Sequence, residues 1–262
     1  MKKIILFMLT AMLTTVAMAQ TKNWKIALHV DPNLSWVKPD NNNLTAGDNL
    51  LNFGFGITID KMFTDNYAIG TGFNIFNTGG QLSYFDELVT DAGQRTIARI
   101  DRSYNLKYLE MPFTLKLRTN EIGYITYWAQ VGVGLGVNIK AKSDDVIDYK
   151  KLENGTTGDT LRWIDAGSLV ADESLEDEDI GKDISIFRTS MIIAGGIEYN
   201  LSGDASIVAG VCLNNAFSNV LKGKGVAASN NEPAFDVPYN TPKVFDLKGI
   251  SNCVSLQVGI LF

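Results

Sequence analysis

Few side chains in this sequence could carry out enzyme chemistry. His29 is the only histidine, so a Ser-His-Asp or Cys-His arrangement for nucleophilic catalysis depends on this residue alone. The two cysteines, Cys212 and Cys253, are too few for a four-thiolate zinc site. The sequence also lacks the GxSxG, HExxH and P-loop patterns. We therefore predict a protein that is not an enzyme and needs no cofactor.

A run of acidic residues is the second candidate for a chemical role. Residues 142–183 contain 13 Asp and Glu but only five Lys and Arg. Within this run, Asp177, Asp179 and Asp183 have the composition of a calcium loop, although the Gly and Glu positions of an EF-hand are not matched. Two interpretations stay open: a solvated, partly disordered extracellular loop, or a divalent-cation site that bridges to lipopolysaccharide or a protein partner.

The overall composition excludes some classes of function. The 262 residues include 23 Lys and Arg against 29 Asp and Glu, which gives a net charge of −6. This charge has the wrong sign for a nucleic-acid-binding protein. The mean hydropathy of +0.03 is high for a soluble domain and low for a helical membrane protein.

The first 19 residues have the layout of a secretory signal peptide. Lys2 and Lys3 precede an apolar stretch over 4–13, and Ala17-Met18-Ala19 matches an A-x-A cleavage site. The apolar stretch is shorter than the roughly 20 residues that a membrane-spanning helix needs. We predict cleavage after Ala19, so that residues 20–262 form the mature domain.

Alternation of apolar and polar residues dominates the mature chain. Within 51–63, for example, Phe53, Phe55, Ile57 and Ile59 alternate with small or polar residues. Such period-2 runs predict β-strands. The predicted strands are 24–38, 50–63, 67–85, 103–118, 123–141, 184–199, 205–218 and 249–262.

The connections between these strands alternate in length. Short turns lie near 64–66, 119–122 and 200–204, and long polar loops cover 39–49, 86–102, 142–183 and 219–248. All short turns and both termini therefore fall at one end of an up-and-down sheet. This layout predicts an all-β, eight-stranded antiparallel transmembrane barrel with short periplasmic turns and long extracellular loops, in the bacterial outer membrane.

The polar face of the strands indicates which side faces the lipid. A soluble lipocalin-like carrier also has eight strands, but its apolar face points inward. Here the polar face is rich in glycine, for example Gly54, Gly56, Gly132 and Gly134, which suits a narrow interior filled by side chains. Strands of 13 or more residues also exceed the roughly 9–11 needed to cross a bilayer. We therefore expect the apolar face to contact lipid.

Aromatic residues gather at the predicted turn end of the barrel. They are Trp24, Phe63, Tyr67, Tyr127, Tyr199 and Phe262. This is the position of an interfacial aromatic girdle. The chain also ends on Phe262 at the close of an alternating strand, which resembles the signal by which the barrel assembly machinery of the outer membrane recognises its clients.

One segment resembles a known family. Residues 108–117 read Tyr-Leu-Glu-Met-Pro-Phe-Thr-Leu-Lys-Leu, which is similar to the "YLE-[IM]-P" strand of PorT-like outer-membrane β-barrel proteins. A short turn and the glycine-alternating segment 131–137 follow, as in that family. The resemblance implies an outer-membrane barrel and, for the best-known member, a role in protein secretion across the outer membrane. The resemblance leaves two roles open: an accessory protein for secretion, or a scaffold for interactions at the cell surface.

The polar face also carries ionisable residues that would point into the lumen. They are Lys25, His29, Asp60, Glu110, Lys116, Arg118, Arg188 and Glu198. Because an unpaired buried charge is several kcal/mol unfavourable, we expect these charges to pair and fill the interior. The alternative is a narrow, porin-like channel or proton path, since ionisable residues at membrane depth are candidates for function.

Three residues on the strands carry separate predictions. Pro112 lies in the middle of a strand, where it removes a hydrogen-bond donor, so we predict a β-bulge near Met111-Pro112; the alternative is that the assigned register of the strand is shifted there. If residue 205 faces 262, Cys212 faces residue 255, two positions from Cys253. A disulfide between Cys212 and Cys253 and two small buried thiols are therefore both open.

Overall fold

The computed structural model describes residues 23–89, 95–154, 161–165, 173–203, 205–229, 232–233, 235–236 and 241–262. The predicted signal peptide lies outside these residues. Among the residues described, no helix is long and apolar enough to cross a membrane.

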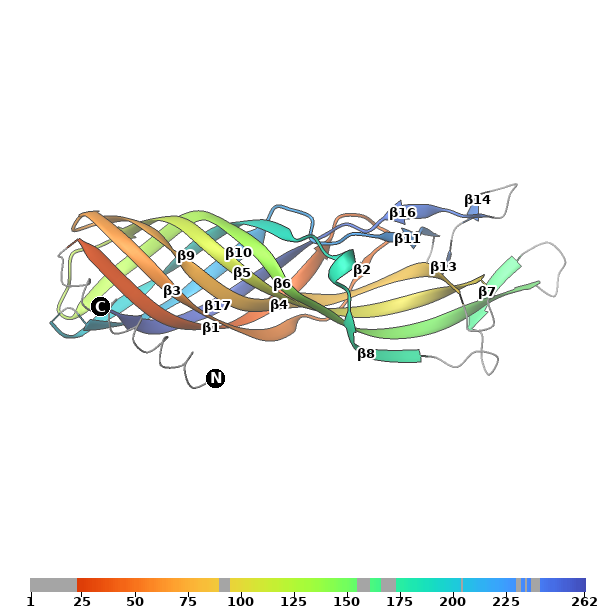
Figure 1. Ribbon diagram of the computed structural model, residues 1–262, viewed down its shortest axis with the longest axis horizontal. Helices are drawn as coiled ribbons and strands as arrows, with labels where there is room; N and C mark the ends of the chain where they lie inside the picture. The colour runs from red at the N-terminus through yellow and green to blue at the C-terminus, as the bar shows by residue number, and fades with distance from the viewer. Residues whose placement is uncertain are drawn as a thin grey trace, which may run out of the picture.

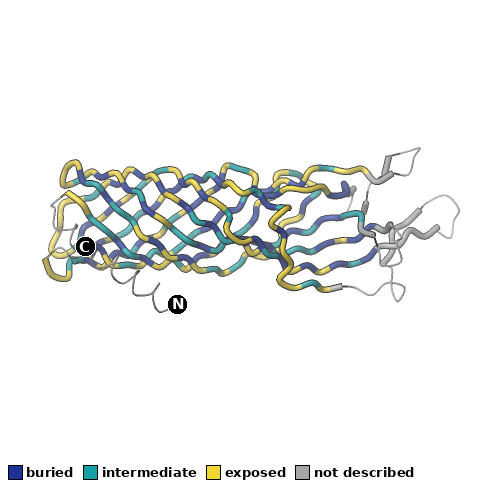
Figure 2. Tube along the Cα trace, viewed as in Figure 1, coloured by how far each residue is buried: buried dark blue, intermediate teal, exposed yellow. Residues whose placement is uncertain are grey.

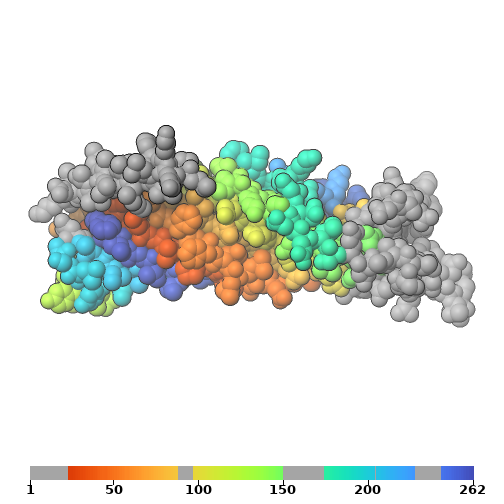
Figure 3. Space-filling view, turned by 60° about the horizontal axis from the view of Figure 1, so that its bottom comes forward, coloured from red at the N-terminus to blue at the C-terminus, as the bar shows by residue number. Residues whose placement is uncertain are grey.

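Long antiparallel strands form the body of the molecule (Figure 1). They are β1 (Trp24–Pro39), β3 (Leu50–Thr64), β4 (Tyr67–Val89), β5 (Arg95–Arg118), β6 (Ile125–Asn154), β9 (Phe187–Ser202), β10 (Ala205–Ala216) and β17 (Gly249–Leu261). Each pairs with the next in this order, and β17 pairs back with β1 over Ala27–Pro39. In the space-filling view the dark blue of β17 lies against the red of β1, so the sheet closes into a barrel (Figure 3).

Shorter elements lie beyond the barrel at the end with the long connections. They are β2 (Thr45–Ala46), β7 (Leu161–Asp165), β8 (Glu173–Asp179), the 3-10 helix η2 (Gly181–Asp183), β11 (Lys224–Val226), β12 (Ala228–Ser229), β13 (Glu232–Pro233), β14 (Phe235–Asp236), β15 (Thr241–Pro242) and β16 (Val244–Asp246). The C-terminus and the short turns lie at the opposite end, as the alternating loop lengths predict (Figure 1). We call these two ends the loop end and the turn end.

The barrel wall near the turn end has its apolar side chains outside and its polar side chains inside. Along β5, Leu109, Met111, Phe113, Leu115 and Leu117 point outward and are at least partly exposed, and the residues between them are largely buried. Figure 2 shows the same alternation of exposed and buried positions along the neighbouring strands. The prediction that the apolar face points outward is therefore confirmed. The alternative, a lipocalin-like barrel with its apolar face inside, is wrong for this part of the wall. Aromatic residues of the predicted girdle, such as Trp24, Tyr127 and Tyr199, are exposed at the turn end.

Three strands extend past the rest of the barrel at the loop end. We call residues 77–89 of β4, 95–107 of β5 and 140–154 of β6 the upper wall, and the remainder of the barrel the lower barrel. The predicted loops 86–102 and 142–183 are therefore wrong in part, because β4, β5 and β6 continue through their first or last residues. On β5 the polarity of the two faces reverses at the boundary. The outward position holds the polar, exposed Asn105, and the inward positions hold the buried Tyr104 and Leu106.

A β-bulge on β6 coincides with this boundary. Lys107 pairs with Lys140, but Tyr108 pairs with Asn138, so Ile139 is an extra residue on β6. Below the bulge the odd-numbered residues of β6, such as Val137, face outward; above it the odd-numbered residues, such as Ile147, are buried. An extra residue shifts the alternation by one position. Residues 142–154 were predicted as a loop because they are rich in charged residues, but they continue strand β6, and odd-numbered residues of this part are buried.

The predicted bulge at Met111-Pro112 is wrong. Pairing with both neighbouring strands keeps one register through these residues, and Pro112 faces Gly134 on β6. On the other side, the ladder with β4 lacks only the positions opposite Met111 and Pro112. The missing N–H of the proline therefore interrupts the ladder locally without an inserted residue.

Candidate functional site

The interior of the lower barrel contains a network of ion pairs near the turn end. Lys116 Nζ lies 2.9 Å from Asp60 Oδ2 and 3.3 Å from Glu198 Oε1. Arg118 also binds Glu198, through Nε at 3.2 Å and through a second contact from Nη2. Lys25 faces Asp60 across the β1–β3 pair. These residues come from four strands, β1, β3, β5 and β9, so the network connects different parts of the wall.

A second ion pair, between Arg188 on β9 and Glu110 on β5, lies further from the turn end of the interior. Arg188 donates to Glu110 Oε2 at 2.9 Å, to Asn214 Oδ1 at 2.8 Å and to the Ser251 carbonyl at 2.9 Å. Glu110 accepts further hydrogen bonds from Ser190 Oγ at 3.0 Å and Asn214 Nδ2 at 2.8 Å. The Arg188 and Glu110 side chains are 0% and 1% exposed. Arg188 Nε has no hydrogen-bond partner among the described groups, but each charge has its counter-ion, so the pair avoids the cost of an uncompensated buried charge.

Glycine at one wall position provides the room for this pair. A Cβ on Gly134 would lie 2.6 Å from both Glu110 Cδ and Ser190 Oγ. A larger residue would therefore push the carboxylate away from its partners. The glycine-rich inner face thus acts as predicted: it makes space for longer side chains from other strands.

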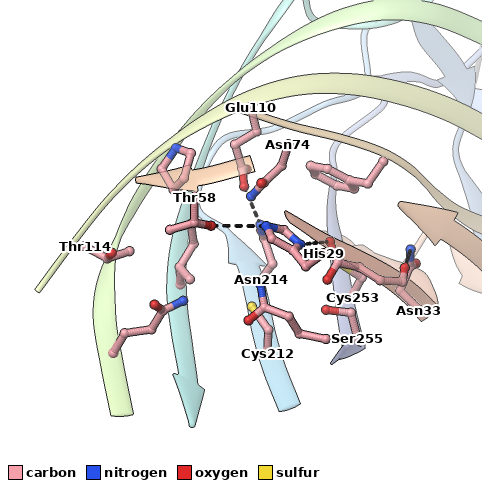
Figure 4. Close-up of a pocket in the computed structure, with 16 residues that line it drawn as sticks. His29, Asn33, Thr58, Asn74, Glu110, Thr114, Cys212, Asn214, Cys253 and Ser255 are labelled. Carbon is pink, nitrogen blue, oxygen red and sulfur yellow. Dashed lines mark hydrogen bonds and ion pairs between the residues drawn. The ribbon is translucent and has the colours of Figure 1, made fainter. Parts of the chain in front are cut away.

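His29 lies between two hydrogen-bonding partners. Its Nδ1 is 2.8 Å from Asp31 Oδ2, and its Nε2 is 3.1 Å from Thr58 Oγ1. Figure 4 shows His29 joined to Thr58 by a dashed line, among side chains from several strands. Asp31 was not among the predicted lumen residues, although it has the same odd parity on β1 as Lys25 and His29. Strict alternation from His29 would have identified it.

A small cavity adjoins His29. Its volume is about 50 Å³, and its lining includes Asp31, Asn33, Asn74 and Cys212. The space is enough for a few water molecules at about 10–15 Å³ each. It is far below the several hundred cubic ångströms of a site for an organic ligand.

The loop end of the interior is closed by an apolar core. Its buried members include Tyr84, Ile100, Tyr104 and Leu106 on the upper wall, and Leu44, Ile184, Val220, Leu221 and Leu247 from the connections opposite. Burial raises the pKa of Tyr104 to about 12, so its hydroxyl stays neutral in this core at physiological pH. Arg102 binds Asp145 through Nε at 2.9 Å and Nη2 at 2.6 Å at the edge of the core.

The three acidic residues considered for a cation site have separate partners. Asp177 Oδ2 lies 3.2 Å from Lys142 Nζ, and Asp179 Oδ1 accepts a hydrogen bond from the Gly181 N–H at 3.0 Å. Asp183 Oδ2 is 3.7 Å from Arg102. No cluster of three or more His, Cys, Asp or Glu side chains suited to a metal occurs in the described part of the chain. The structure therefore does not bring these three carboxylates together.

Cys212 and Cys253 are free thiols on neighbouring strands. Cys212 pairs with Ser255, as the register argument predicts, and Cys253 pairs with Asn214. The two residues are thus diagonal neighbours, a spacing of about 7–8 Å between Cα atoms that is too wide for an unstrained bridge.

Comparisons with known proteins agree with this fold. Residues 18–222 match the model of the outer membrane protein beta-barrel domain. The chain belongs to this family. It is an outer-membrane β-barrel protein, with the antiparallel all-β barrel fold. No curated protein matches the sequence.

Several solved barrels are similar at low identity. OprG from Pseudomonas aeruginosa is 15% identical, with 92% of this chain and 95% of OprG covered and a TM-score of 0.41. Ail of Yersinia pestis, in complex with the heparin analogue sucrose octasulfate, is 17% identical, with 92% and 99% covered and a TM-score of 0.36. The outer membrane protease OmpT from Escherichia coli is 11% identical, with 93% and 97% covered and a TM-score of 0.34.

Proposed function

We propose that this protein is a non-enzymatic, eight-stranded barrel whose lumen is closed and whose function lies in the upper wall, as a surface-interaction scaffold or a PorT-like secretion accessory. The observation that carries this proposal is the interior itself. The Glu110–Arg188 pair and the network around Lys116 cross the lumen, and an apolar core lies over them. Paired charges across the lumen, with an apolar core over them, support a closed lumen in the described part of the barrel.

The upper wall supports a role in interaction. Its outer face carries charged and polar residues such as Arg99, Asp101, Asp144 and Asp148, where the lower barrel has an apolar belt. The three strands therefore project beyond the lipid-facing region and present a stiff polar surface to a partner. The motif at 108–117, similar to that of PorT-like proteins, supports an envelope protein as that partner.

The membrane-related partners belong to the same proposal. The apolar belt would contact lipid and lipopolysaccharide, and Phe262 would be read by the barrel assembly machinery. Phe262 exchanges backbone hydrogen bonds with Ile26, at 2.8 and 3.0 Å, and so completes the barrel seam. Export would depend on the segment 1–19, with cleavage after Ala19.

A non-enzymatic role is supported by the position of His29. This single histidine is 6% exposed, and it lies inside the barrel beside a cavity too small for an organic substrate. An outer-membrane hydrolase would need its histidine where substrate can reach it.

Conductance measurements test the closed lumen. We expect wild-type protein in planar bilayers to show no stable channel, and the double variant Glu110→Ser, Arg188→Ser to show higher or more frequent conductance. Heat-modifiable gel mobility would confirm that both proteins are folded. Stable conductance in the wild type would contradict the closed lumen and support the narrow, porin-like channel instead.

Photo-crosslinking in cells tests the surface role. A photoreactive residue placed at Asp144 or Asp148 on the upper wall should give protein adducts, and the same residue at the lipid-facing Leu115 should not. Equal adduct patterns at the two kinds of position, or none at the upper wall, would contradict a role in interaction.

A further inference from the structure

One carboxylate inside the barrel differs from the others in its partners. Asp60, Glu110 and Glu198 each contact a Lys or Arg side chain. Within the described residues, Asp31 has only His29 as an ion-pair partner. At this depth a buried carboxylate that lacks a counter-charge is costly. A bound cation beside Asp31 would offset this cost.

One oxygen atom of Asp31 and two amide oxygen atoms of residues that line the same cavity have no hydrogen-bond donor among the described groups. They are Asp31 Oδ1, Asn33 Oδ1 and Asn74 Oδ1, and all three are buried. Asn33 is only 4% exposed, and its Nδ2 donates to the carbonyls of Asn77 at 3.3 Å and Asp31 at 3.5 Å. These bonds fix the amide so that Oδ1, and not the NH₂ group, is the atom without a partner.

The three side chains line the same cavity beside His29. Asp31, Asn33 and Asn74 all contribute to the space of about 50 Å³. Gly56 on β3 opens it between β1 and β4, because a Cβ there would lie 2.2 Å from Asn74 Oδ1 and 2.8 Å from His29 Cε1. The cavity therefore has room for one ion with a few waters.

We propose that this cavity binds one alkali-metal cation, such as Na⁺ or K⁺, through Asp31 Oδ1 and the amide oxygens of Asn33 and Asn74. Carboxylate and amide oxygens are hard ligands that suit hard cations. One formal negative charge matches a monovalent ion, whereas a divalent ion would leave a net positive charge buried. His29 has Nδ1 2.8 Å from Asp31 Oδ2 and Nε2 3.1 Å from Thr58 Oγ1, so it holds the second carboxylate oxygen in place.

Anomalous diffraction tests the site directly. In crystals of the full mature protein grown with RbCl, we expect an anomalous peak within about 3 Å of Asp31 Oδ1 and Asn33 Oδ1. The peak should disappear in Asp31→Asn. No peak in the wild type, or a peak that persists in Asp31→Asn, would overturn the proposal.

Unfolding in lipid vesicles gives a second readout. We compare KCl with N-methyl-D-glucamine chloride at equal ionic strength. At a K⁺ concentration ten times the dissociation constant, the unfolding equilibrium constant should fall about tenfold. The effect should vanish in Asp31→Asn and persist in Asp101→Asn, which alters a carboxylate on the upper wall.

A cavity-filling variant covers the case in which Asp31→Asn does not fold. Gly56→Ala keeps all three proposed ligands but places a methyl group against Asn74 and His29. It should lose the difference between K⁺ and the organic cation. Equal unfolding of the wild type in the two salts would overturn the proposal, as would a K⁺ effect that Gly56→Ala leaves intact.

Discussion

The lower barrel and the upper wall are built from the same strands but have opposite orientations of polarity. In the lower barrel, β5 places Glu110 and Lys116 inside and Phe113 and Leu115 outside. A few residues earlier, the same strand places Leu106 inside. The lower barrel is therefore arranged for lipid outside, and the upper wall is arranged like a soluble β-protein. The difference shows that the surrounding solvent, and not the strand geometry, decides which face is apolar.

The reversal of polarity between the two regions arises in different ways on the neighbouring strands β5 and β6. On β5 the even-numbered residues stay inside throughout, and the residue types change at Lys107–Leu109. On β6 most apolar residues stay odd-numbered, with Val146 as an exception, and the bulge at Ile139 moves the odd-numbered set from the outside to the inside. Both changes fall at the same level because Lys107 pairs with Lys140. At this level the outward faces of both strands change from largely apolar to largely polar.

The largest effect is expected from breaking the buried ion pair of the lower barrel. Arg188→Met leaves Glu110 charged and buried without its counter-ion, which should cost about 3–5 kcal/mol. Urea unfolding in vesicles measures the loss. Adding Glu110→Gln should restore most of the stability, since no uncompensated charge is then left. A single variant as stable as the wild type would mean that water reaches this site.

Core packing in the upper wall should give a loss confined to that region. Leu106 is fully buried, and Leu106→Ala should destabilise the upper wall by about 2–5 kcal/mol. Hydrogen exchange should accelerate for amides of 98–106 and 141–149. It should change little for amides of the lower barrel, such as those of 111–117. Uniform acceleration along β5 would show that the two regions unfold as one unit.

The outward faces offer a matched pair of substitutions. Leu115 and Val146 are similarly exposed, at 46% and 47%, on the lower barrel and the upper wall. Leu115→Arg places a charge in lipid and should cost about 2–4 kcal/mol. Val146→Arg faces water and should change stability by no more than about 0.5 kcal/mol. Equal costs would contradict the placement of the membrane boundary between these residues.

The same comparison explains what sequence reasoning could and could not predict. The lower barrel followed from alternation, because its apolar belt repeats from strand to strand and glycine recurs on the inner face of several strands, such as β3, β4 and β6. The upper wall was missed because Arg99, Asp101 and Asp144 have the composition of a loop. Their buried neighbours, such as Ile100, alternate with them but on the opposite side from the apolar residues of the lower barrel.

For the interior of the barrel, the sequence predicted which residues lie inside better than it predicted which of them contact each other. His29, Asp60, Glu110, Lys116, Arg188 and Glu198 are buried inside as expected. Their partners depend on which strands face each other across the lumen, which alternation along one strand does not contain. Glu110 meets Arg188 and Asn214 only because β5, β9 and β10 face the same space. Asp31 and Asn33 share the odd parity of His29, but the cavity that they line with Asn74 depends on the same spatial information.

Breaking the ion pair of the upper wall should cost less than breaking that of the lower barrel. Arg102 and Asp145 are 15% and 4% exposed, and Arg102 also has Asp183 at 3.7 Å. Asp145→Asn should therefore cost about 1.5–3 kcal/mol, the value of hydrogen bonds to a charged group. The guanidinium keeps a second carboxylate and a route to water, which Glu110 lacks after loss of Arg188. Hydrogen exchange at 143–147, with Asp101→Asn as the surface control, measures this loss. A cost equal to that of Arg188→Met would mean that the upper wall excludes water as completely as the lower barrel does.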